Sequence, residues 1–312
     1  MAINSLDENF RRFFTRINPS SSYEATASSE QNNVVRLLES AQGPASAIKP
    51  RCFLQGSYKQ DTAIHSINDI DIVALCDLYY PGSGTGRSYD RDAIFTLLAD
   101  ALNQDHRYRG KLRFNSGSLC IKINLEIKVE ILPAVKPQGE SDFDHEPFFI
   151  YRPEEGKWGT AYAREHQRLM TKKNEQADKF YKPMIKVFKH LRDVWQGLKQ
   201  EDAISFHIEC LLYRVPDSVF FGSIADAVEG VLSSVARFTL DQSVSSGITS
   251  PCGVKILFSE SEWSKGAYTR FHVYANRWSE LAYQANRKQN WSDAVKTWKD
   301  LFGDDYFPRD VS

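Results

Sequence analysis

Two aspartates that lie two residues apart, Asp69 and Asp71, are the side chains of this sequence best placed for chemistry. They open the run Asp-Ile-Asp-Ile-Val-Ala-Leu-Cys-Asp, residues 69–77, whose apolar content predicts a buried strand. Because successive side chains of a strand leave opposite faces, both carboxylates share one face and the isoleucines point into the core. Two neighbouring carboxylates repel each other unless a cation lies between them, and Mg2+ prefers such oxygen donors. The pair therefore predicts a divalent metal site.

A third acid comes from a second segment, which has a strictly alternating pattern. Over residues 119–131 every odd position is apolar and the even positions are mostly polar, which predicts strands with one polar face. Glu130 lies on that polar face and is the expected third metal ligand, while Glu126 shares the face and competes for the role. Pro133 and Pro137 are expected to end the strand.

Just upstream of the two aspartates, the sequence predicts a phosphate-binding turn. Residues 50–55 form a short expected strand that ends at Gly56 and Ser57. A glycine at a strand end lets backbone N–H groups approach a phosphate, and a serine adds a hydroxyl donor. A Gly-Ser pair, then Asp-x-Asp on a strand, then a distant acid on another strand form a specific combination, although each part alone carries little information. We therefore expect one functional site from these residues.

Charge and hydropathy exclude several classes of function. The chain has 312 residues, with 39 Lys and Arg against 40 Asp and Glu, which gives a net charge of -1. A protein that binds long duplexes usually carries a basic excess, so no double-stranded DNA partner is expected. No run approaches the roughly 18 apolar residues of a membrane span, and the N-terminus does not resemble a signal peptide. We expect no membrane partner and a cytoplasmic location.

The remaining patterns predict an α/β part followed by a mostly helical part. Helices are expected over residues 5–17, from residues 18–22 to about Ser40, and over 89–103, with a turn or short helix over 58–66. The glycine-rich stretch 80–87 lacks the Gly-Lys-Ser/Thr ending of a P-loop and is expected to be a connector. A loop with a short strand at 148–151 is expected over 138–160, and helical periodicity dominates from about residue 160.

The residues around Gly56 and the aspartates resemble a known family. Residues 53–64 and 68–73 resemble the polymerase-β-like nucleotidyltransferases. They are most similar to the bacterial cyclic oligonucleotide synthases of the cyclic GMP-AMP synthase/DncV-like (CD-NTase, SMODS) type from CBASS antiphage defence. Further matches are the third-carboxylate strand at 129–134, a basic helix at 183–191, a Ser-x-x-x-Glu helix at 205–212 and a C-terminal tail at 298–307. The family usually has Asp as the third acid, where this sequence has Glu130.

The resemblance implies a fold and an activity. It implies a polymerase-β-like nucleotidyltransferase core with a mixed sheet and an N-terminal spine helix over residues 1–160, and a helical C-terminal lobe of the oligoadenylate-synthase type over 161–312. The implied activity is synthesis of a cyclic di- or trinucleotide second messenger from nucleoside triphosphates, ATP among them, in bacterial antiphage signalling. The C-terminal tail favours an adenine-containing trinucleotide. Asp69, Asp71 and Glu130 would hold two Mg2+ ions, with Mn2+ as a substitute.

The resemblance also implies nucleotide contacts from residues spread along the chain. These are Gly56, Ser57, Thr62, Asn174, Lys186, Lys189 and Ser205. For the basic helix an alternative stays open, because four lysines recur there at helical spacing and would also make an ordinary solvated face. Glu209 is a possible structural partner of this helix.

Two other functions remain open at this point. A linear template-independent nucleotide polymerase or tRNA 3′-end transferase would share the metal site, but it would need a broader basic surface than a net charge of -1 favours. An inactive nucleotide-binding module is the second alternative, because Glu130 departs from the family pattern. An activating accessory protein is a further partner that the resemblance allows.

Overall fold

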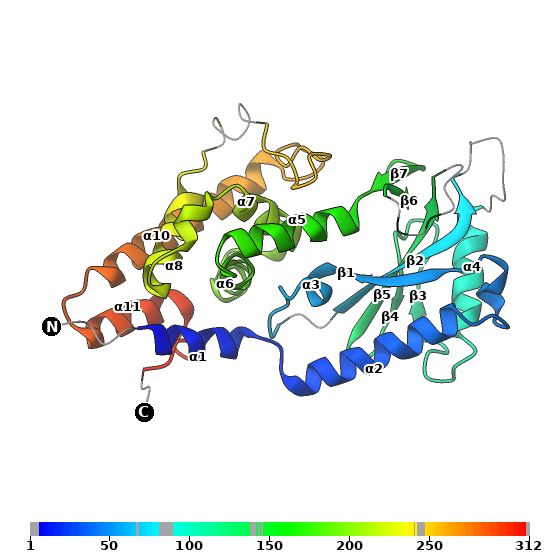
Figure 1. Ribbon diagram of the computed structural model, residues 1–312, viewed down its shortest axis with the longest axis horizontal. Helices are drawn as coiled ribbons and strands as arrows, with labels where there is room; N and C mark the ends of the chain where they lie inside the picture. The colour runs from blue at the N-terminus through cyan, green and yellow to red at the C-terminus, as the bar shows by residue number, and fades with distance from the viewer. Residues whose placement is uncertain are drawn as a thin grey trace. The chain divides into compact units, whose positions relative to one another are not determined.

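The computed structural model describes residues 6–66, 69–80, 90–137, 142, 144, 146–239, 241 and 247–309 (Figure 1). Most of the glycine-rich stretch 80–87, expected as a connector, lies outside these described residues. By their internal packing the residues form two compact units. The sheet unit contains Ser20–Asp61 and Ser66–Glu165, and the helical unit contains Met1–Pro19, Thr62–His65 and His166–Ser312.

The two units differ in two respects from the expected boundary between residues 160 and 161, and the first is that the division falls between Glu165 and His166. Two short pieces from the first 160 residues, Met1–Pro19 and Thr62–His65, pack with the helical unit. The chain therefore passes between the units more than once, and neither unit is one continuous stretch. Periodicity along a sequence does not reveal this, because it shows which face of an element is buried and not which partner buries it.

The sheet unit is built on a seven-stranded mixed sheet. Its main path runs β1-β2-β5-β4-β3, and β6 pairs with both β5 and β7. The strands are β1 (Arg51–Gln55), β2 (Asp69–Tyr79), β3 (Leu112–Arg113), β4 (Ile121–Ile123), β5 (Lys128–Lys136), β6 (Phe148–Arg152) and β7 (Lys157–Ala161). The helices are α2 (Ser21–Leu38), α3 (Gly56–Lys59) and α4 (Arg91–Leu102), with a 3-10 turn at Pro44–Ala47. Strands β2 and β5 run parallel and the other described pairs are antiparallel, which confirms the predicted α/β class with a mixed sheet.

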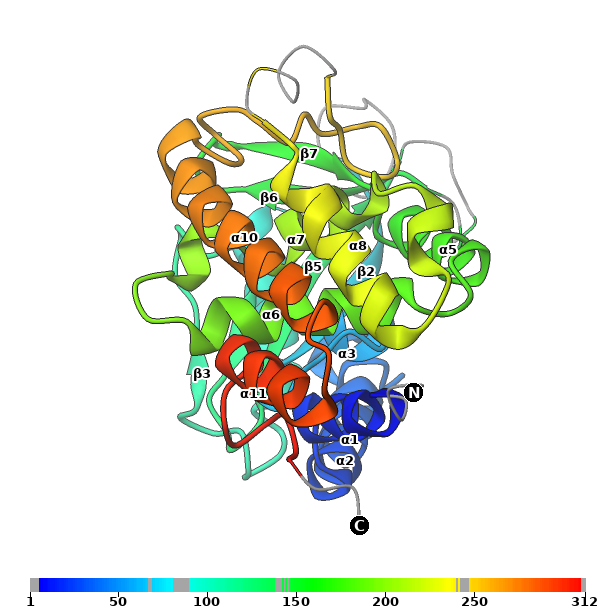
Figure 2. The same cartoon turned by 90° about the vertical axis from the view of Figure 1, so that its left-hand side faces the viewer.

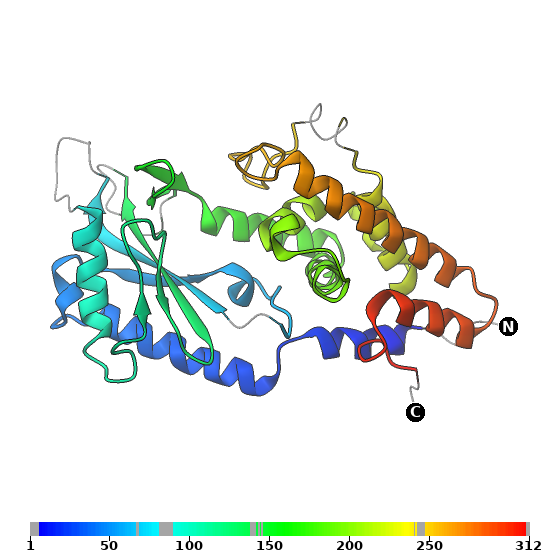
Figure 3. The same ribbon diagram turned by 180° about the vertical axis from the view of Figure 1, so that it is seen from behind.

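The two faces of β2 have different surroundings, as the alternation predicts. Ile70 and Ile72 are fully buried in a core to which α2 and α4 contribute, and these helices cover that face of the sheet (Figure 3). Asp69 and Asp71 alternate with the isoleucines and are only half-buried. Val73 follows them on the same face, in a small separate apolar cluster. The strand therefore begins with carboxylates on one face and continues there as core.

The strand that contains Glu130 ends directly before Pro137, as expected, but the expectations for Pro133 and for the loop at 138–160 are wrong. Strand β5 continues through Pro133 and ends at Lys136. Pro133 lies between the residues that pair with β4, 129–131, and those that pair with β6, 134–135, so the missing N–H falls where the neighbouring strand changes. In addition, β7 forms in the stretch 138–160 that the sequence predicts as loop with one short strand, and it pairs only with β6.

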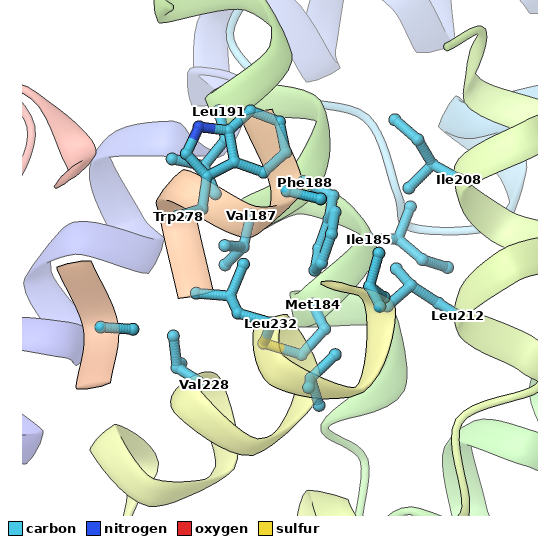
Figure 4. Packing of buried hydrophobic residues seen from close by; sticks show 14 of the residues in the cluster. Met184, Ile185, Val187, Phe188, Leu191, Ile208, Leu212, Val228, Leu232 and Trp278 are labelled. Carbon is cyan, nitrogen blue, oxygen red and sulfur yellow. The ribbon is translucent and has the colours of Figure 1, made fainter. Parts of the chain in front are cut away.

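The helical unit packs around α6. Its helices are α1 (Asp7–Ile17), α5 (Ala163–Gln176), α6 (Tyr181–Val194), α7 (Ser205–Tyr213), α8 (Ile224–Ala236), α10 (Lys265–Asn286) and α11 (Trp291–Phe302), with 3-10 turns at Gln200–Asp202 and Asp217–Phe220. Helices α8 and α10 run side by side (Figure 2). Apolar side chains of α6, among them Met184 and Phe188, meet Leu212 of α7, Leu232 of α8 and Trp278 of α10 (Figure 4). No helix in the described ranges is long and apolar enough to cross a membrane.

Segments from the two ends of the chain pack together in the helical unit. The rings of Phe13 in α1 and Phe302 in α11 are stacked, with their centroids 4.2 Å apart. The Asn9 side-chain amide donates a hydrogen bond of 2.9 Å to the carbonyl oxygen of Pro308. Asn9, Phe13 and Phe302 are all fully buried, so α1 belongs to the core of this unit.

Candidate active site

The parallel pairing of β2 and β5 brings two predicted carboxylates to adjacent positions. Asp71 and Glu130 are direct partners in the register of the two strands, and Asp69 is the partner of Lys128. Partners in adjacent strands point to the same face of a sheet, so Asp69, Asp71 and Glu130 share one face. Glu126 lies in the turn between β4 and β5 and is exposed, away from this register. Of the two acids the sequence left open, Glu130 is therefore the one beside Asp71.

The predicted phosphate-binding turn lies directly against Asp71. Gln55, the last residue of β1, is the antiparallel partner of Asp71, and Gly56 follows with a φ of 73°. A Cβ atom at Gly56 would lie 1.9 Å from Asp71 Oδ2, which is far inside contact distance. Only glycine fits here, because it tolerates the left-handed conformation and leaves the space that the carboxylate uses. Ser57, half-buried, follows in the first turn of α3.

Both oxygens of Glu130 accept hydrogen bonds from neighbouring side chains. Lys122 Nζ on β4 lies 2.7 Å from Oε1, and the thiol of Cys120 lies 3.4 Å from Oε2. The hydrogen bond to Glu130 raises the pKa of the Lys122 ammonium. Burial raises the pKa of the Cys120 thiol to about 12, with Glu130 as the second cause, so the thiol stays protonated and donates. Lys122 and Glu130 are also direct register partners on β4 and β5.

Asp69 has a tyrosine beside it. The hydroxyl of Tyr23 in α2 lies 3.3 Å from the backbone carbonyl oxygen of Asp69. Burial, followed by the negative charge of Asp69, raises the pKa of Tyr23 to about 12. The hydroxyl therefore remains a neutral donor over the physiological range, and it links α2 to the start of β2.

In the helical unit, Thr62 and Lys189 lie together. Lys189 on α6 is fully buried, and its ammonium donates to the carbonyl oxygen of Thr62 at 3.1 Å and to the hydroxyl at 3.2 Å. The same ammonium lies 3.2 Å from Glu209 on α7, and His166 lies 3.5 Å from the other oxygen of that carboxylate. Burial alone would raise the pKa of Glu209, but the charges of Lys189 and His166 outweigh burial and lower it.

The other nucleotide-binding residues predicted in the helical unit have separate surroundings. Lys186 is buried and donates to the side-chain oxygen of Asn18 at 3.0 Å. Asn174 accepts a 3.0 Å hydrogen bond from the backbone N–H of Lys182 at the start of α6. Ser205 is half-buried at the first residue of α7. The alternative of a solvated lysine face is wrong for Lys186 and Lys189, because α6 is surrounded by other helices of its unit.

The family follows from comparison of the whole chain with known proteins. A family model for the second messenger oligonucleotide or dinucleotide synthetase domain matches residues 4–174. The chain belongs to this synthetase family. A second model, for the C-terminal helical domain of cGAS/DncV-like nucleotidyltransferases, matches residues 168–281 of the synthetase. The resemblance noted in the sequence is confirmed: the synthetase is a nucleotidyltransferase that makes a cyclic oligonucleotide second messenger from nucleoside triphosphates.

Individual relatives cover most of the synthetase. A cyclic UMP-AMP synthase of Rhodothermus marinus is 28% identical over 247 residues, which cover 72% of this chain and 83% of the relative. A cyclic dipyrimidine nucleotide synthase of Legionella pneumophila is 25% identical over 84% of this chain and 94% of the relative. The crystal structure of the Vibrio cholerae cyclic AMP-GMP synthase DncV matches with a TM-score of 0.73 at 15% identity, covering 98% of each chain. The fold is therefore shared over nearly the whole length.

The donor set of the synthetase fits a hard divalent cation, although its third carboxylate has other partners in this structure. Synthetases of this family are metal-dependent nucleotidyltransferases. Asp69, Asp71 and Glu130 supply only carboxylate oxygens from one face of two adjacent strands, which is the chemistry that such cations prefer. Within the described ranges, no three His, Cys, Asp or Glu side chains converge closely enough to hold a metal. Both oxygens of Glu130 instead accept from Lys122 and Cys120.

Sequence reasoning missed several residues of the synthetase that contact the predicted ones. Lys122 has a readable signal, because it occupies an even position of the alternating segment and a hairpin brings such positions of its two strands to one face. His166, which contacts Glu209, lies in an ordinary helical pattern with no signal. Tyr23 likewise belongs to a helix whose distance from β2 the sequence does not specify.

Proposed function

We propose that this synthetase builds a cyclic dinucleotide by phosphoryl transfer at Asp69, Asp71 and Glu130. The observation that carries the proposal is the alignment of Asp71 beside Glu130 on parallel strands, with Gly56 packed against the Asp71 carboxylate. The ring size is supported by the two curated relatives described above, whose names specify dinucleotide products. The C-terminal tail, which favours a trinucleotide, is the competing argument.

The proposed cofactor is Mg2+, held by Asp69, Asp71 and Glu130 as two ions, with Mn2+ as a substitute. Bound there, the metal would neutralise triphosphate charge and lower the pKa of the attacking ribose hydroxyl. Strand pairing fixes the three carboxylates to one face, so metal binding requires the Glu130 side chain to leave its present hydrogen bonds while the strands stay in place. Glu130 in place of the family's aspartate adds one methylene, which lengthens the reach of the third carboxylate.

The remaining site residues would bind and orient the donor nucleotide. In this proposal Gly56 keeps the backbone close to Asp71, and Ser57 and Thr62 donate hydroxyl hydrogen bonds to the triphosphate. Lys186, Lys189, Asn174 and Ser205 are further proposed contacts; Lys189 is fully buried against Thr62 and Glu209, so its contact requires this packing to open. The acceptor ribose hydroxyl loses its proton to Glu130 and attacks the α-phosphorus, and pyrophosphate leaves. A second transfer in the same site closes the ring. Positioning and charge supply most of the rate.

We further propose that ATP is one substrate and that the product acts as a messenger in antiphage signalling. The name of the Rhodothermus marinus relative, a cyclic UMP-AMP synthase, supports an adenine nucleotide. An accessory protein that activates the synthetase is part of the proposal.

The test is a product assay with a matched set of variants. The purified chain is incubated with labelled ATP, GTP, CTP and UTP and with Mg2+ or Mn2+, treated with phosphatase, and analysed by mass spectrometry. The double variant Asp69→Asn/Asp71→Asn is compared with Asp100→Asn, which removes an exposed carboxylate from α4. We expect a phosphatase-resistant cyclic dinucleotide from the wild type and from Asp100→Asn, and none from the double variant.

Other products would change the conclusion in specific ways. A cyclic trinucleotide would correct the ring size and favour the argument from the C-terminal tail. A linear ladder would favour the polymerase or tRNA 3′-end transferase. Saturable nucleotide binding without pyrophosphate release would favour the inactive module, and repeating the assay with cell extract would separate this result from a missing activator.

A further inference from the structure

A lysine is ion-paired with the third carboxylate of the proposed metal site. Lys122 and Glu130 are direct partners across β4 and β5, and Nζ lies 2.7 Å from Oε1. The Lys122 side chain is 55% exposed and that of Glu130 is 29% exposed, so the pair lies at the edge of the site and is open to solvent. Cys120 donates to Oε2, the other oxygen of the same carboxylate.

This pairing matters because an ammonium and a metal ion compete for the same oxygens. A carboxylate that accepts a charge-assisted hydrogen bond from lysine already has its charge compensated. A divalent cation that recruits Glu130 must displace Nζ from Oε1 or share the carboxylate with it. Asp71, the neighbour of Glu130 on β2, is separated from Lys122 by β5 in the strand order. The hydrogen bond of Lys122 is made to the third ligand, while Asp69 acts on the ammonium only through its charge.

The chemistry of lysine suits a competitor that can be displaced. Its ammonium is a compact and strongly hydrated charge on a flexible four-carbon chain. Because more than half of the Lys122 side chain is exposed, the ammonium can leave Glu130 at a small cost, since water replaces the lost hydrogen bond. The thiol of Cys120 is a weak donor and does not compensate the charge of Glu130.

We propose that Lys122 is an internal competitor of the divalent cation, which keeps Glu130 out of the metal site until a metal ion displaces it. The inference rests on the proposed function in one respect, the assignment of Glu130 as a metal ligand. Without metal, only the two aspartates are then available as ligands. Glu130 becomes a ligand when a cation binds its carboxylate tightly enough to displace the Lys122 ammonium. Lys122 thereby sets the metal concentration at which the site is complete.

The test measures Mn2+ binding by the full chain without any nucleotide, by calorimetry or by the electron paramagnetic resonance signal of free Mn2+. The variant Lys122→Gln removes the competing charge and keeps the length of the side chain. We expect it to bind Mn2+ about two- to fivefold more tightly than the wild type, the range for a half-exposed ion pair. Lys122→Arg keeps the charge, and its affinity should stay at or below the wild-type value.

A double-mutant cycle shows whether Lys122 acts through Glu130. In the Glu130→Gln background, Lys122→Gln should give no gain in Mn2+ affinity, because no carboxylate remains to be released. Lys128→Gln is the matched control, since it removes an exposed lysine from β5 beside Asp69. It should give a smaller gain than Lys122→Gln. Thermal unfolding of each variant checks that the sheet unit is intact.

Three results would overturn the proposal. An unchanged or weaker Mn2+ affinity in Lys122→Gln would mean that the lysine does not compete. An equal gain in Mn2+ affinity in the Glu130→Gln background, or from Lys128→Gln, would mean that the overall positive charge near the site lowers the affinity and that the pairing of Lys122 with Glu130 does not. Failure of the proposed function is a different result: Asp69→Asn/Asp71→Asn would leave Mn2+ binding unchanged, so the metal site itself would be wrongly placed.

Discussion

Gly56 and Asp71 lie so close together that a Cβ atom on the glycine would stand 1.9 Å from Oδ2 of the carboxylate. The close packing of the two residues joins the end of β1 to the carboxylate strand β2. It follows from the pairing of Gln55 with Asp71, after which the chain turns with a φ of 73°. The Gly-Ser pair and the Asp-x-Asp motif are thus two sides of one packed contact.

The first prediction concerns this contact. Gly56→Ala should lower the free energy of unfolding by about 1–2 kcal/mol, the cost of an L-residue in the left-handed region, and should lower turnover at least tenfold by moving Asp71. Gly110→Ala is the matched control, because Gly110 has a φ of 75° and nothing within 4 Å of its Cβ position. Urea unfolding and product assays separate the two effects. Equal turnover in both variants would contradict the steric argument.

The second prediction concerns the buried pair of Lys189 and Glu209. Lys189→Met leaves the Glu209 charge buried with only His166 near it, and we expect a loss of about 3 kcal/mol of stability. The double variant Lys189→Met/Glu209→Gln should recover most of this loss, because no uncompensated charge remains. Urea unfolding measures both. Lys172→Met, at an exposed position of α5, is the control, and a loss as large there would argue against a specific pair.

The third prediction is a pH dependence of stability due to His190. Burial lowers the pKa of His190 to about 4, although the hydrogen bond to the Phe302 carbonyl oxygen acts in the opposite direction. The unfolded chain titrates near the ordinary value of about 6.5, so it binds the proton more readily than the folded chain between these values. The stabilising contribution is therefore complete above about pH 6.5 and is lost as the pH falls towards 4. It amounts to about 3 kcal/mol at most.

Urea unfolding between about pH 7 and pH 4.5 measures this slope. His190→Phe should flatten it, while also losing the 2.8 Å hydrogen bond with the Phe302 carbonyl oxygen at every pH. His106→Gln removes a histidine whose side chain is 86% exposed and should keep the wild-type slope. A slope that survives in His190→Phe would assign the acid sensitivity to other groups.

The fourth prediction concerns the segment Thr62–His65, which joins α3 to β2 in the chain. Tyr306 Oη lies 3.1 Å from His65 Nε2, and the His65 N–H donates to the Ile17 carbonyl oxygen at 2.9 Å. Tyr306→Phe should speed amide exchange over residues 62–66 by about two- to tenfold, as expected for one lost hydrogen bond. It should also lower turnover severalfold. Tyr283→Phe, at a 48% exposed tyrosine of α10, should do neither. A uniform change along the chain would contradict a local role.

The sequence predicts the strands well where one face is polar and poorly where both faces are covered. The alternation around Asp69 and Asp71 correctly separates the core face from the carboxylate face. Leu119 has the same apolar signal as the residues after it, yet it is 44% exposed because it precedes β4. Pro133 is an expected strand end and lies inside β5, because strand pairing depends on neighbours that no single segment encodes.

For the candidate site, residue type and spacing indicate the carboxylates but not their partners. The choice of Glu130 over Glu126 needs the strand register, which depends on where the hairpin turns. The lysines of α6 have the spacing of a surface stripe, yet Lys189 is fully buried because Glu209 and Thr62 satisfy it. Such compensation comes from helices distant in sequence, so periodicity does not predict it.

The packing of α1 against the last helix affects the order in which the chain can fold as it is synthesised. Phe13 reaches its stacking partner only after Phe302 has left the ribosome, and Asn9 likewise has to wait for Pro308. Until then one apolar face of α1 stays exposed and the helical unit is unfinished. Thr62–His65 belongs to that unit, so the link between the Gly-Ser turn and the Asp-x-Asp strand is fixed late. A nascent chain would therefore contain all three carboxylates before the segment between the Gly-Ser turn and the Asp-x-Asp strand had packed into the helical unit.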